Sequence, residues 1–308
     1  MDGKAKTEER ILPNVLTVGF PRELLGKTFI NVDKIKSVAM SVVIHTVLII
    51  VSLSCIFPLW WAFASSLKTQ ATVFSNLSLF PAHPEWSNYL EAWTKASFAV
   101  YFRNSIFYTS TVVTGVVLVS SLAAYAFSRF QFPGKDFLFI LLISTMMIPI
   151  PGSFIALYVL LVKLNLANTP LGYILPQING GMALGIFLLK TFFDDLPKEL
   201  EESARIDGCG QFRVYWYIAL PLAKPAIAVL SIFTILTVWN EYLLAMLVLT
   251  SKELMPLQRG LMVFQGSHIT QYPLLMAGIV ITIIPVVVVY LVLQKYIIKG
   301  ITSGAVKG

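Results

Sequence analysis

The chain has 308 residues, of which 56% are hydrophobic and 13% are charged, and its mean hydropathy is +0.76. So apolar a composition excludes a soluble domain of this length and indicates a protein of the lipid bilayer. The net charge of +7 is explained by basic residues kept on the cytosolic side of a membrane, so we expect no nucleic-acid partner.

Residues 1–36 are predicted to form a cytosolic N-terminal leader rather than a domain. Prolines and glycines interrupt its short apolar groups, which favours an extended or partly amphipathic segment. Gly26-Lys27-Thr28 matches the end of a phosphate-binding loop, but Pro21 stands where that pattern needs its first glycine. We therefore predict no nucleotide site in this chain. We also predict no cleavable signal peptide, because the first apolar run is long enough to span the membrane and to remain as an anchor.

Six stretches are long and apolar enough to cross roughly 30 Å of hydrocarbon, which takes about 20 residues of helix. The first three contain no charged residue, whereas the fourth and fifth contain proline, asparagine or glutamate, which indicates contact with protein or water. The prediction is an all-α membrane protein with a transmembrane domain over residues 37–298 and a cytosolic tail over 299–308. The six predicted transmembrane helices are residues 38–64, 104–128, 137–162, 171–189, 225–249 and 274–294.

The basic residues orient these helices, because lysines and arginines beside a span are retained in the cytosol. Of the 23 lysines and arginines, 17 fall on one side if the chain crosses the membrane six times. Both termini are therefore predicted to be cytosolic, as is the segment 194–222. The first external loop, 65–103, is rich in aromatic residues, which we expect at the water–lipid interface, with direct contact to a ligand as the alternative. These residues are Trp86, Tyr89, Trp93, Phe98, Tyr101 and Phe102.

The cysteines and histidines show no arrangement typical of a disulfide or a metal site. Cys55 falls in the first span and Cys209 in the cytosolic segment, so their different depths predict two unpaired thiols. His45, His83 and His268 are scattered over one span and two external loops without the spacing of metal ligands. We therefore predict no metal site.

The cytosolic segment 194–222 is predicted to begin with a helix. Asp194 and Asp195 precede Pro197, and both negative charge and proline favour the first turn of a helix, so the helix should begin there. Good helix formers follow, and Gly208 supplies the left-handed residue that ends the helix.

A second short helix is predicted over residues 211–218, before Pro221 turns the chain back toward the membrane. On the first helix, Glu202 and Arg205 are three residues apart and share a face, and Leu200 and Ala204 form a small apolar patch nearby. The small side chains of Ser203 and Ala204 would let another protein come close. A charged helix face is most often simply solvated, and spacing alone leaves that alternative open.

The order of residues in this segment resembles a known motif. Permeases of binding-protein-dependent ABC importers carry Glu-Ala-Ala, three residues, Gly, nine residues and then Ile-x-Leu-Pro in a cytosolic loop. The chain matches this spacing throughout, with Ser203 in place of the first alanine and with Asp207 also typical. The matching residues are Glu202, Ala204, Gly208, Ile218, Leu220 and Pro221.

The resemblance extends over nearly the whole chain beyond the leader. Several further segments are similar to the smaller permease of carbohydrate importers such as the maltose system, and their shared order makes the match specific. These segments are residues 58–60, 66–69, 103–105, 122–130, 239–243, 294–296 and 300–308.

What the resemblance implies is the permease fold of a type I ABC importer, in a bacterial or archaeal cytoplasmic membrane. This subunit would pair with a homologous permease above an ABC ATPase dimer and would receive a sugar or oligosaccharide from an extracytoplasmic binding protein. It would be a transport subunit rather than an enzyme, and it would bind no cofactor, because ATP and Mg belong to the ATPase.

The resemblance also implies which residues contact the ATPase. The helix over residues 199–206 would sit in a cleft of the ATPase with Glu202 facing a basic group, and the tail from Ile301 would reach toward the ATPase dimer interface. The residues implied in coupling are Glu199, Glu202, Ser203, Ala204, Arg205, Asp207, Gly208, Leu220 and Pro221.

Four polar residues inside the spans are candidates for the translocation path. Gln177 and Asn179 lie beside Pro176 and two glycines, where irregular backbone is tolerated along a cavity but not against lipid. Asn240 and Glu241 lie about 24 Å along the fifth span at about 1.5 Å per residue, toward its outer end. Amides suit sugar hydroxyls, yet hydrogen bonds between helices explain the same residues equally well. In the third span, packing and a kink are expected from Met146, Met147, Pro149 and Pro151.

Three other functions compete with this hypothesis. A secondary carrier driven by an ion gradient needs charged residues near the midplane of several spans, and only Glu241 is a candidate. A membrane-embedded enzyme needs an acid, base or metal cluster at one depth, and the predicted spans contain none. An ABC permease for a non-sugar solute has the same architecture, so the sequence favours a sugar only through the resemblance.

Overall fold

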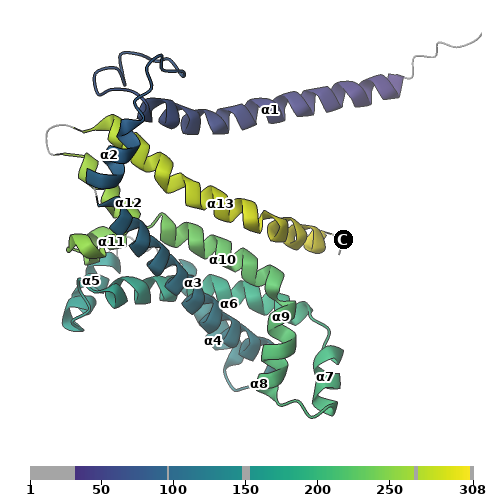
Figure 1. The fold of residues 1–308 in the computed structure, drawn as a ribbon. Helices are drawn as coiled ribbons and strands as arrows, with labels where there is room; N and C mark the ends of the chain where they lie inside the picture. Colours follow the sequence, from purple (N-terminus) through teal and green to yellow (C-terminus); the bar gives the residue numbers. More distant parts are fainter. Residues whose placement is uncertain (1–31, 96, 148–152, 267–269, 306–308) are drawn as a thin grey trace, which may run out of the picture. The chain divides into compact units, whose positions relative to one another are not determined.

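The computed structural model of the chain describes residues 32–95, 97–147, 153–266 and 270–305. Within these ranges the regular structure is helical, apart from one isolated antiparallel bridge between Gln265 and Thr270. The elements drawn in Figure 1 are α1 (Val32–Ser66), α2 (Ser87–Lys95), α3 (Phe98–Arg129), α4 (Lys135–Ser144), η1 (Thr145–Met147), α5 (Ser153–Lys163), α6 (Pro170–Asp195), α7 (Glu199–Ile206), α8 (Gln211–Val214), the π-helix η3 (Tyr215–Ala219), α9 (Leu220–Leu222), α10 (Lys224–Trp239), α11 (Leu243–Val248), η4 (Lys252–Leu254), α12 (Leu257–Gly260), η5 (Leu261–Phe264) and α13 (Tyr272–Ala305).

The chain divides into two compact units, residues 1–55 and 56–308, whose boundary falls inside α1. The second unit holds the end of α1 and the elements from α2 to α13. Within this unit, α7 and α8 lie at the opposite end of α3 from α2 (Figure 1). The core and the candidate sites all belong to this unit.

Four helices of the described chain are long and apolar enough to cross a membrane. They cover the first, second, fourth and sixth predicted spans, so these four predicted helices are confirmed as helices. Lipid imposes this form, because backbone polar groups inside a bilayer must be paired within the segment itself. The four are Ala39–Ser66, Phe98–Arg129, Pro170–Asp195 and Tyr272–Lys295.

The third predicted span, 137–162, is not a single helix in the described residues. It consists of the short helices α4 and α5, with the 3-10 turn η1 after α4, where Met146 and Met147 are exposed. The kink predicted at Pro149 and Pro151 lies outside the described residues. Neither α4 nor α5 reaches the length of about 20 residues that a crossing needs, so the count of six crossings stays a prediction.

The fifth predicted span, 225–249, is also broken. α10 ends at Trp239 and α11 begins only at Leu243. At its other end, α10 meets the helix Gln211–Leu222 at an angle of 73°. The described chain therefore contains four helices able to cross a membrane, or five if this bent pair acts as one span.

α3 and α6 pack side by side and form the centre of the core. Small residues let them approach closely. A Cβ on Gly181 would lie 2.8 Å from the side chain of Val116, and a Cβ on Gly185 would lie 2.4 Å from the hydroxyl oxygen of Ser120. The same Ser120 hydroxyl donates to the carbonyl oxygen of Met182 at 3.4 Å, which ties the two helices across the contact.

Side-chain amides tie loops to helices at the end of the unit that carries α2. Asn104 donates to the carbonyl oxygens of Glu253 at 2.7 Å and Met255 at 3.1 Å. Gln70 donates to the carbonyl oxygen of Thr270 at 2.7 Å. The bonds of Asn104 hold the segment after α11 against the start of α3, and the bond of Gln70 joins the loop after α1 to the residues before α13.

Phe98 and Tyr101 are buried, so their predicted place at the water–lipid interface is wrong. Phe98 packs against Phe264, with ring centroids 5.8 Å apart, and the ring of Tyr101 fills the space where a Cβ on Gly260 would stand. The reason is that α12 and η5 cover the first turn of α3 and convert it into core.

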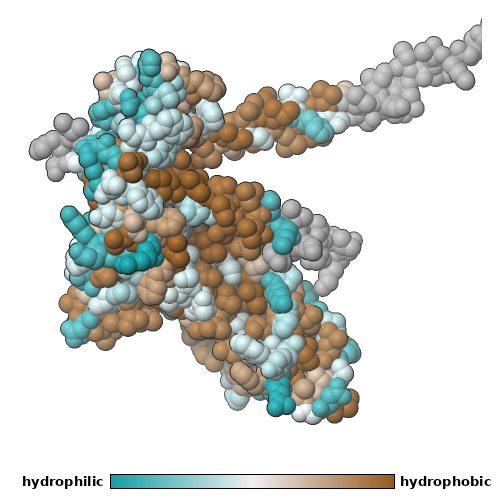
Figure 2. All heavy atoms as spheres, in the orientation of Figure 1, coloured by the Kyte–Doolittle hydropathy of each residue, from teal (hydrophilic) through white to brown (hydrophobic). Residues whose placement is uncertain are grey.

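Apolar side chains dominate the surface between the two ends of the unit. Figure 2 shows them gathered over α13 and its neighbours, with many hydrophilic residues in the loop after α1 and a mixture of hydrophilic and apolar residues around α7 and α8. On α13, exposed apolar residues include Ile284, Val288 and Leu291. Such a continuous apolar surface suits contact with lipid or with another membrane subunit.

Candidate functional site

Asp194 and Asp195 belong to the last turn of α6. The prediction that a new helix begins there is therefore wrong. The Asp194 carboxylate accepts hydrogen bonds from Lys190 Nζ and Ser128 Oγ, both at 2.6 Å, and these partners hold it on α6. α7 begins at Glu199, and the acidic residues of its first turn suit the positive end of the helix dipole.

Gly208 follows α7 in the left-handed conformation, with φ at +84°, as the sequence predicts. Its N–H donates to the carbonyl oxygen of Arg205 at 3.0 Å, and the N–H of Cys209 donates to that of Ala204 at 2.9 Å. The second bond spans five residues, which is typical of a helix ended by a left-handed residue. No atom lies within 4 Å of the Cβ position of Gly208, so the need for glycine is conformational rather than steric.

The second predicted helix is longer than residues 211–218. α8, η3 and α9 run continuously over Gln211–Leu222, with Leu220 half-buried and Pro221 exposed in the last turn. The chain then bends at Ala223 into α10. The predicted turn near Pro221 is therefore confirmed.

α7 has one face packed on its own chain and one face exposed. Glu201 and Ala204 are buried, and their three-residue spacing puts them on the same face. Ala204 is 9% exposed, so the prediction that it lies open to another protein is wrong. The predicted coupling residues on the exposed side are Glu199, Glu202, Ser203, Arg205, Asp207 and Gly208.

The exposed polar residues of α7 differ in their bonding. The Glu202 carboxylate makes no hydrogen bond or ion pair with any residue that the structure describes, although its backbone N–H donates to the carbonyl oxygen of Lys198 at 3.0 Å. Ser203 donates its hydroxyl to the carbonyl oxygen of Glu199 at 2.9 Å. Arg205 donates to Gln211 Oε1 at 3.2 Å, which ties α7 to α8 and leaves the Glu202 carboxylate free.

Large apolar side chains extend the exposed face of α7. Ile206 is 87% exposed, and Phe212 and Trp216 of the following helix are also exposed. The rings of Phe212 and Trp216 are stacked, with centroids 6.3 Å apart. A free carboxylate beside exposed apolar side chains has the chemistry of a protein docking surface.

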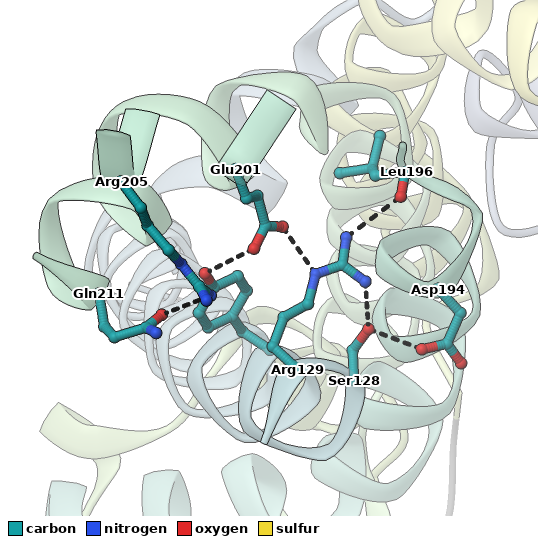
Figure 3. Close-up of polar contacts among 8 residues, drawn as sticks. Ser128, Arg129, Asp194, Leu196, Glu201, Arg205 and Gln211 are labelled. Atoms are coloured by element: carbon teal, nitrogen blue, oxygen red, sulfur yellow. Dashed lines mark hydrogen bonds and ion pairs between the residues drawn. The ribbon is translucent and has the colours of Figure 1, made fainter. Parts of the chain in front are cut away.

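The buried carboxylate of Glu201 is the charged centre of this region (Figure 3). Arg129 Nε donates to Glu201 Oε1 at 2.7 Å, and each side chain is only 5% exposed. Tyr125 donates its hydroxyl to the other carboxylate oxygen at 3.1 Å. The remaining guanidinium nitrogens donate to Ser128 Oγ at 3.0 Å and to the carbonyl oxygen of Leu196 at 3.3 Å.

Reasoning from the sequence missed Glu201 and Arg129. The sequence contains one local indication of the role of Glu201. Glu201 stands three residues before Ala204, so these two residues share a face of the helix, and Glu202 lies on a different face. The two partners are 72 residues apart, and spacing along the chain does not reveal such a pairing.

Gln177 and Asn179, two of the four path candidates, lie in α6, where Gln177 is half-buried and Asn179 is exposed. Gln177 Nε2 donates to the carbonyl oxygen of Tyr173 at 3.3 Å, within its own helix. Its Oε1 is buried without a hydrogen-bond partner among the described residues. An unsatisfied buried amide oxygen is uncommon and suits a position where a donor arrives from outside the chain.

Asn240 and Glu241, the other two path candidates, lie in the break between α10 and α11. The Glu241 carboxylate accepts the N–H groups of Leu244 at 2.6 Å and Ala245 at 3.0 Å, so it caps the N-terminus of α11. Asn240 is exposed and accepts a hydrogen bond from Gln258 at 3.2 Å. Across the residues with described positions, no hydrogen bond links this pair to the two amides of α6.

None of the four path candidates lines the apolar groove between α3, α10 and α13. This groove, of about 260 Å³, is walled almost entirely by apolar groups; among its walls are Ile106, Val113, Ile235, Val286 and Val289. The part of the chain that the structure describes also contains no group of three or more His, Cys, Asp or Glu side chains able to hold a metal ion.

Comparison with known proteins identifies a family. Residues 116–303 match the family described as binding-protein-dependent transport system inner membrane component. The chain is 35% identical to the probable ABC transporter permease protein YurM of Bacillus subtilis (strain 168), over 82% of this chain and 84% of that protein. It is 32% identical to the diacetylchitobiose uptake system permease protein NgcG of Streptomyces coelicolor, over 84% of this chain and 87% of that protein.

A solved structure is similar over nearly its whole length. It is a chain of a bacterial ABC transporter involved in the import of the acidic polysaccharide alginate, with a TM-score of 0.74 and 26% sequence identity. The likeness covers 88% of this chain and 99% of that chain. The arrangement of helices described above is therefore shared with a transporter subunit.

Proposed function

Because the chain belongs to the family of binding-protein-dependent transport system inner membrane components and is a permease subunit of an ABC importer, we propose that α7 couples it to a separate ATPase. The observation that carries this proposal is the division of α7 into two faces. Glu201 and Ala204 attach the helix to its own chain, whereas Glu202 and Ile206 face outward without partners in the described chain.

The outward face of α7 matches a cleft that contains a basic group and an apolar wall. A charge-assisted contact to Glu202 would contribute about 1.5–3 kcal/mol, and burial of Ile206 about 1.5–3 kcal/mol. Ser203 is small and already satisfies its own hydroxyl, so it lets a partner approach closely. Arg205 and Gly208 hold the end of the helix in place, as a joint that transmits a rigid-body rotation requires.

The remaining predicted coupling residues have supporting positions in this proposal. Glu199 and Asp207 add exposed negative charge at the two ends of α7, Leu220 and Pro221 form the last turn before the bend into α10, and Ala204 acts from the buried side. Ala204 packs α7 against its own chain and does not contact the ATPase in this proposal.

The partners in this proposal follow from the family. A homologous second permease completes the path, an ABC ATPase dimer binds ATP and Mg, and an extracytoplasmic binding protein delivers the solute. The exposed apolar residues of α13 and the hydrophilic loops at the α2 end of the unit support membrane and external contacts of this kind.

The proposed solute is a sugar or oligosaccharide. Two relatives support this class, since one is named for diacetylchitobiose uptake and another takes part in alginate import. The amide side chains of Gln177, Asn179 and Asn240 offer donors and acceptors for hydroxyl groups, and the buried oxygen of Gln177 still lacks a donor among the described residues. Glu241 would act on the path indirectly, through the helix that it caps.

The proposed membrane arrangement is that predicted from the sequence. The protein lies in a bacterial or archaeal cytoplasmic membrane with six crossings and both termini in the cytosol. It has a leader over residues 1–36, the permease domain over 37–298 with the coupling loop 194–222, and a tail over 299–308. The 17 basic residues on one side support this orientation.

The substitution Glu202→Lys tests the coupling proposal in the assembled importer. We expect the variant to insert normally but to lose co-purification with the ATPase, sugar uptake into proteoliposomes and stimulation of ATP hydrolysis by the binding protein. The matched control is Glu253→Lys, which reverses an exposed charge on η4 at the other end of the unit and should leave co-purification with the ATPase unchanged. Normal uptake by the Glu202→Lys importer would contradict the proposal.

A further inference from the structure

We propose that the Arg129–Glu201 ion pair is the joint that passes the motion of α7 into α3, and that without it ATP is hydrolysed with little transport. This inference rests on the proposed function, because it assumes that α7 is driven by an ATPase. It concerns the opposite face of α7 from the one that docks, and it assigns Arg129 and Glu201 as positioning residues.

The guanidinium of Arg129 joins three elements. Arg129 is the last residue of α3, and its Nε contacts Glu201 of α7 at 2.7 Å. A second nitrogen donates to the carbonyl oxygen of Leu196, between α6 and α7, at 3.3 Å. The third donates to Ser128 Oγ, which in turn donates to Asp194 of α6 at 2.6 Å. A displacement of α7 therefore acts at once on the ends of α3 and α6 (Figure 3).

The ion pair is one of three contacts that follow a single stripe of α3. Ser121, Tyr125 and Arg129 are spaced four residues apart and so lie on the same face. Ser121 shares a 2.8 Å hydrogen bond with the Tyr215 hydroxyl, and the other two hold the two oxygens of Glu201. The whole coupling segment is thus fastened to one helix over two turns.

Burial makes this fastening stiff. Both charged side chains are 5% exposed, so water cannot replace either partner if the pair separates. The carboxylate is held from two directions, by the guanidinium and by the Tyr125 hydroxyl, which restricts its rotation. When α7 moves, separating the charges costs more than moving α3 along with it.

A different pair at the same end of the molecule provides the contrast. Lys190 and Asp194 form an ion pair at 2.6 Å, but both belong to α6 and both are partly exposed. A bond inside one helix cannot carry motion to another element. Removing Lys190 while keeping Asp194, which stays bonded to Ser128, should therefore leave coupling intact.

The alternative is that the Arg129–Glu201 pair only holds the coupling segment folded. In that case its loss would reduce the amount of assembled importer, while each assembled importer would still transport the normal quantity of sugar per ATP hydrolysed. The ratio of uptake to hydrolysis separates the two roles, because it is measured on assembled complexes only.

The main test is Glu201→Gln in the complete importer reconstituted with its binding protein. Glutamine keeps the shape and one acceptor oxygen but removes the charge. We expect normal co-purification with the ATPase, since the Glu202 face is unchanged, and a fall of about tenfold or more in uptake per ATP, the size of a typical coupling free energy. The double variant R129E/E201R restores an ion pair with the two charges exchanged. It should take up more sugar per ATP than either Arg129→Glu or Glu201→Arg alone.

Two further variants complete the design. Lys190→Met should leave uptake per ATP at the wild-type value. Tyr125→Phe keeps the ring packing and removes one hydrogen bond, so it should assemble even if Glu201→Gln does not, and it should lower uptake per ATP by a smaller factor.

If assembled Glu201→Gln importer takes up the wild-type quantity of sugar per ATP hydrolysed, the inference is overturned. If Glu201→Gln does not assemble with the ATPase, an unchanged ratio in Tyr125→Phe overturns it. Normal uptake by the Glu202→Lys importer would instead count against the proposed function.

Discussion

Asn168 and Ser251 are joined by two hydrogen bonds. The Oδ1 of Asn168 accepts the backbone N–H of Ser251 at 2.9 Å, and its Nδ2 donates to the Ser251 hydroxyl at 2.8 Å. Asn168 also holds a left-handed backbone, with φ at +56°, which asparagine tolerates better than most residues. One residue therefore shapes the turn before α6 and anchors the segment that follows α11.

We expect Asn168→Ala to destabilise the protein by about 2–3 kcal/mol, because it loses the side-chain bonds and strains the left-handed backbone. Asn168→Gly loses the same bonds but relieves the strain, so it should be less destabilised by about 1 kcal/mol. Thermal unfolding of the two purified variants in detergent gives the comparison. If alanine and glycine are equally stable, the backbone part of this explanation fails.

Gly208→Ala should shift or fray the end of α7, at a cost of about 1–2 kcal/mol for a left-handed alanine. We expect weaker co-purification with the ATPase, and partial recovery with Gly208→Asn, since asparagine adopts this conformation more readily. Gly210→Ala is the matched control, because Gly210 has an ordinary φ of −69° and open space at its Cβ position. Wild-type ATPase binding by Gly208→Ala would show that the cap is dispensable.

Gly185→Ala should push α3 and α6 apart, since its Cβ would meet the Ser120 side chain at 2.4 Å. The expected cost is about 1–3 kcal/mol, typical of an overpacked core, and it should appear as a lower unfolding temperature. Gly180→Ala on the same helix adds a methyl group into open space and should be neutral. The double variant S120G/G185A restores room at the contact, and its failure to recover stability would argue against a steric cause.

Glu241→Gln distinguishes a helix cap from a charge required on the path. The carboxylate bonds two backbone N–H groups of α11, and glutamine can still accept one of them. We expect sugar uptake within a few-fold of wild type, and a stability loss of about 1 kcal/mol. Glu241→Leu accepts no hydrogen bond and should lose more stability. Complete loss of uptake by a stable, assembled Glu241→Gln importer would indicate that the charge itself is needed.

The helices inside the bilayer were largely predictable from sequence. Long uncharged stretches must become helices in lipid, and the predicted second and sixth spans correspond closely to α3 and to the apolar part of α13. The two broken spans were harder to predict, because hydropathy does not report where a carboxylate such as Glu241 starts a new helix. Burial of Phe98 and Tyr101 was also unpredictable, since it depends on α12 and η5, more than 150 residues away.

Within the candidate site, the sequence predicted local backbone conformation correctly but did not predict which distant side chains pair. The left-handed conformation of Gly208 follows from its position after good helix formers, and the structure has it. By contrast, Glu201 and Glu202 are chemically identical neighbours, and the buried one is the one that meets Tyr125 and Arg129 of α3. The functions of the predicted coupling and path residues stay predictions until the variants above are measured.

The helix Gln211–Leu222 and α10 meet at an angle of 73°, so the chain has a sharp bend at Ala223. If the two helices were collinear, rotation of the first about its long axis would only rotate the second about the same axis. With a bend of this angle, the same rotation of the helix Gln211–Leu222 would move α10 sideways along an arc. A twist applied at the inner surface of the membrane would in this way become lateral travel within it, and the size of that travel would grow with distance from Ala223.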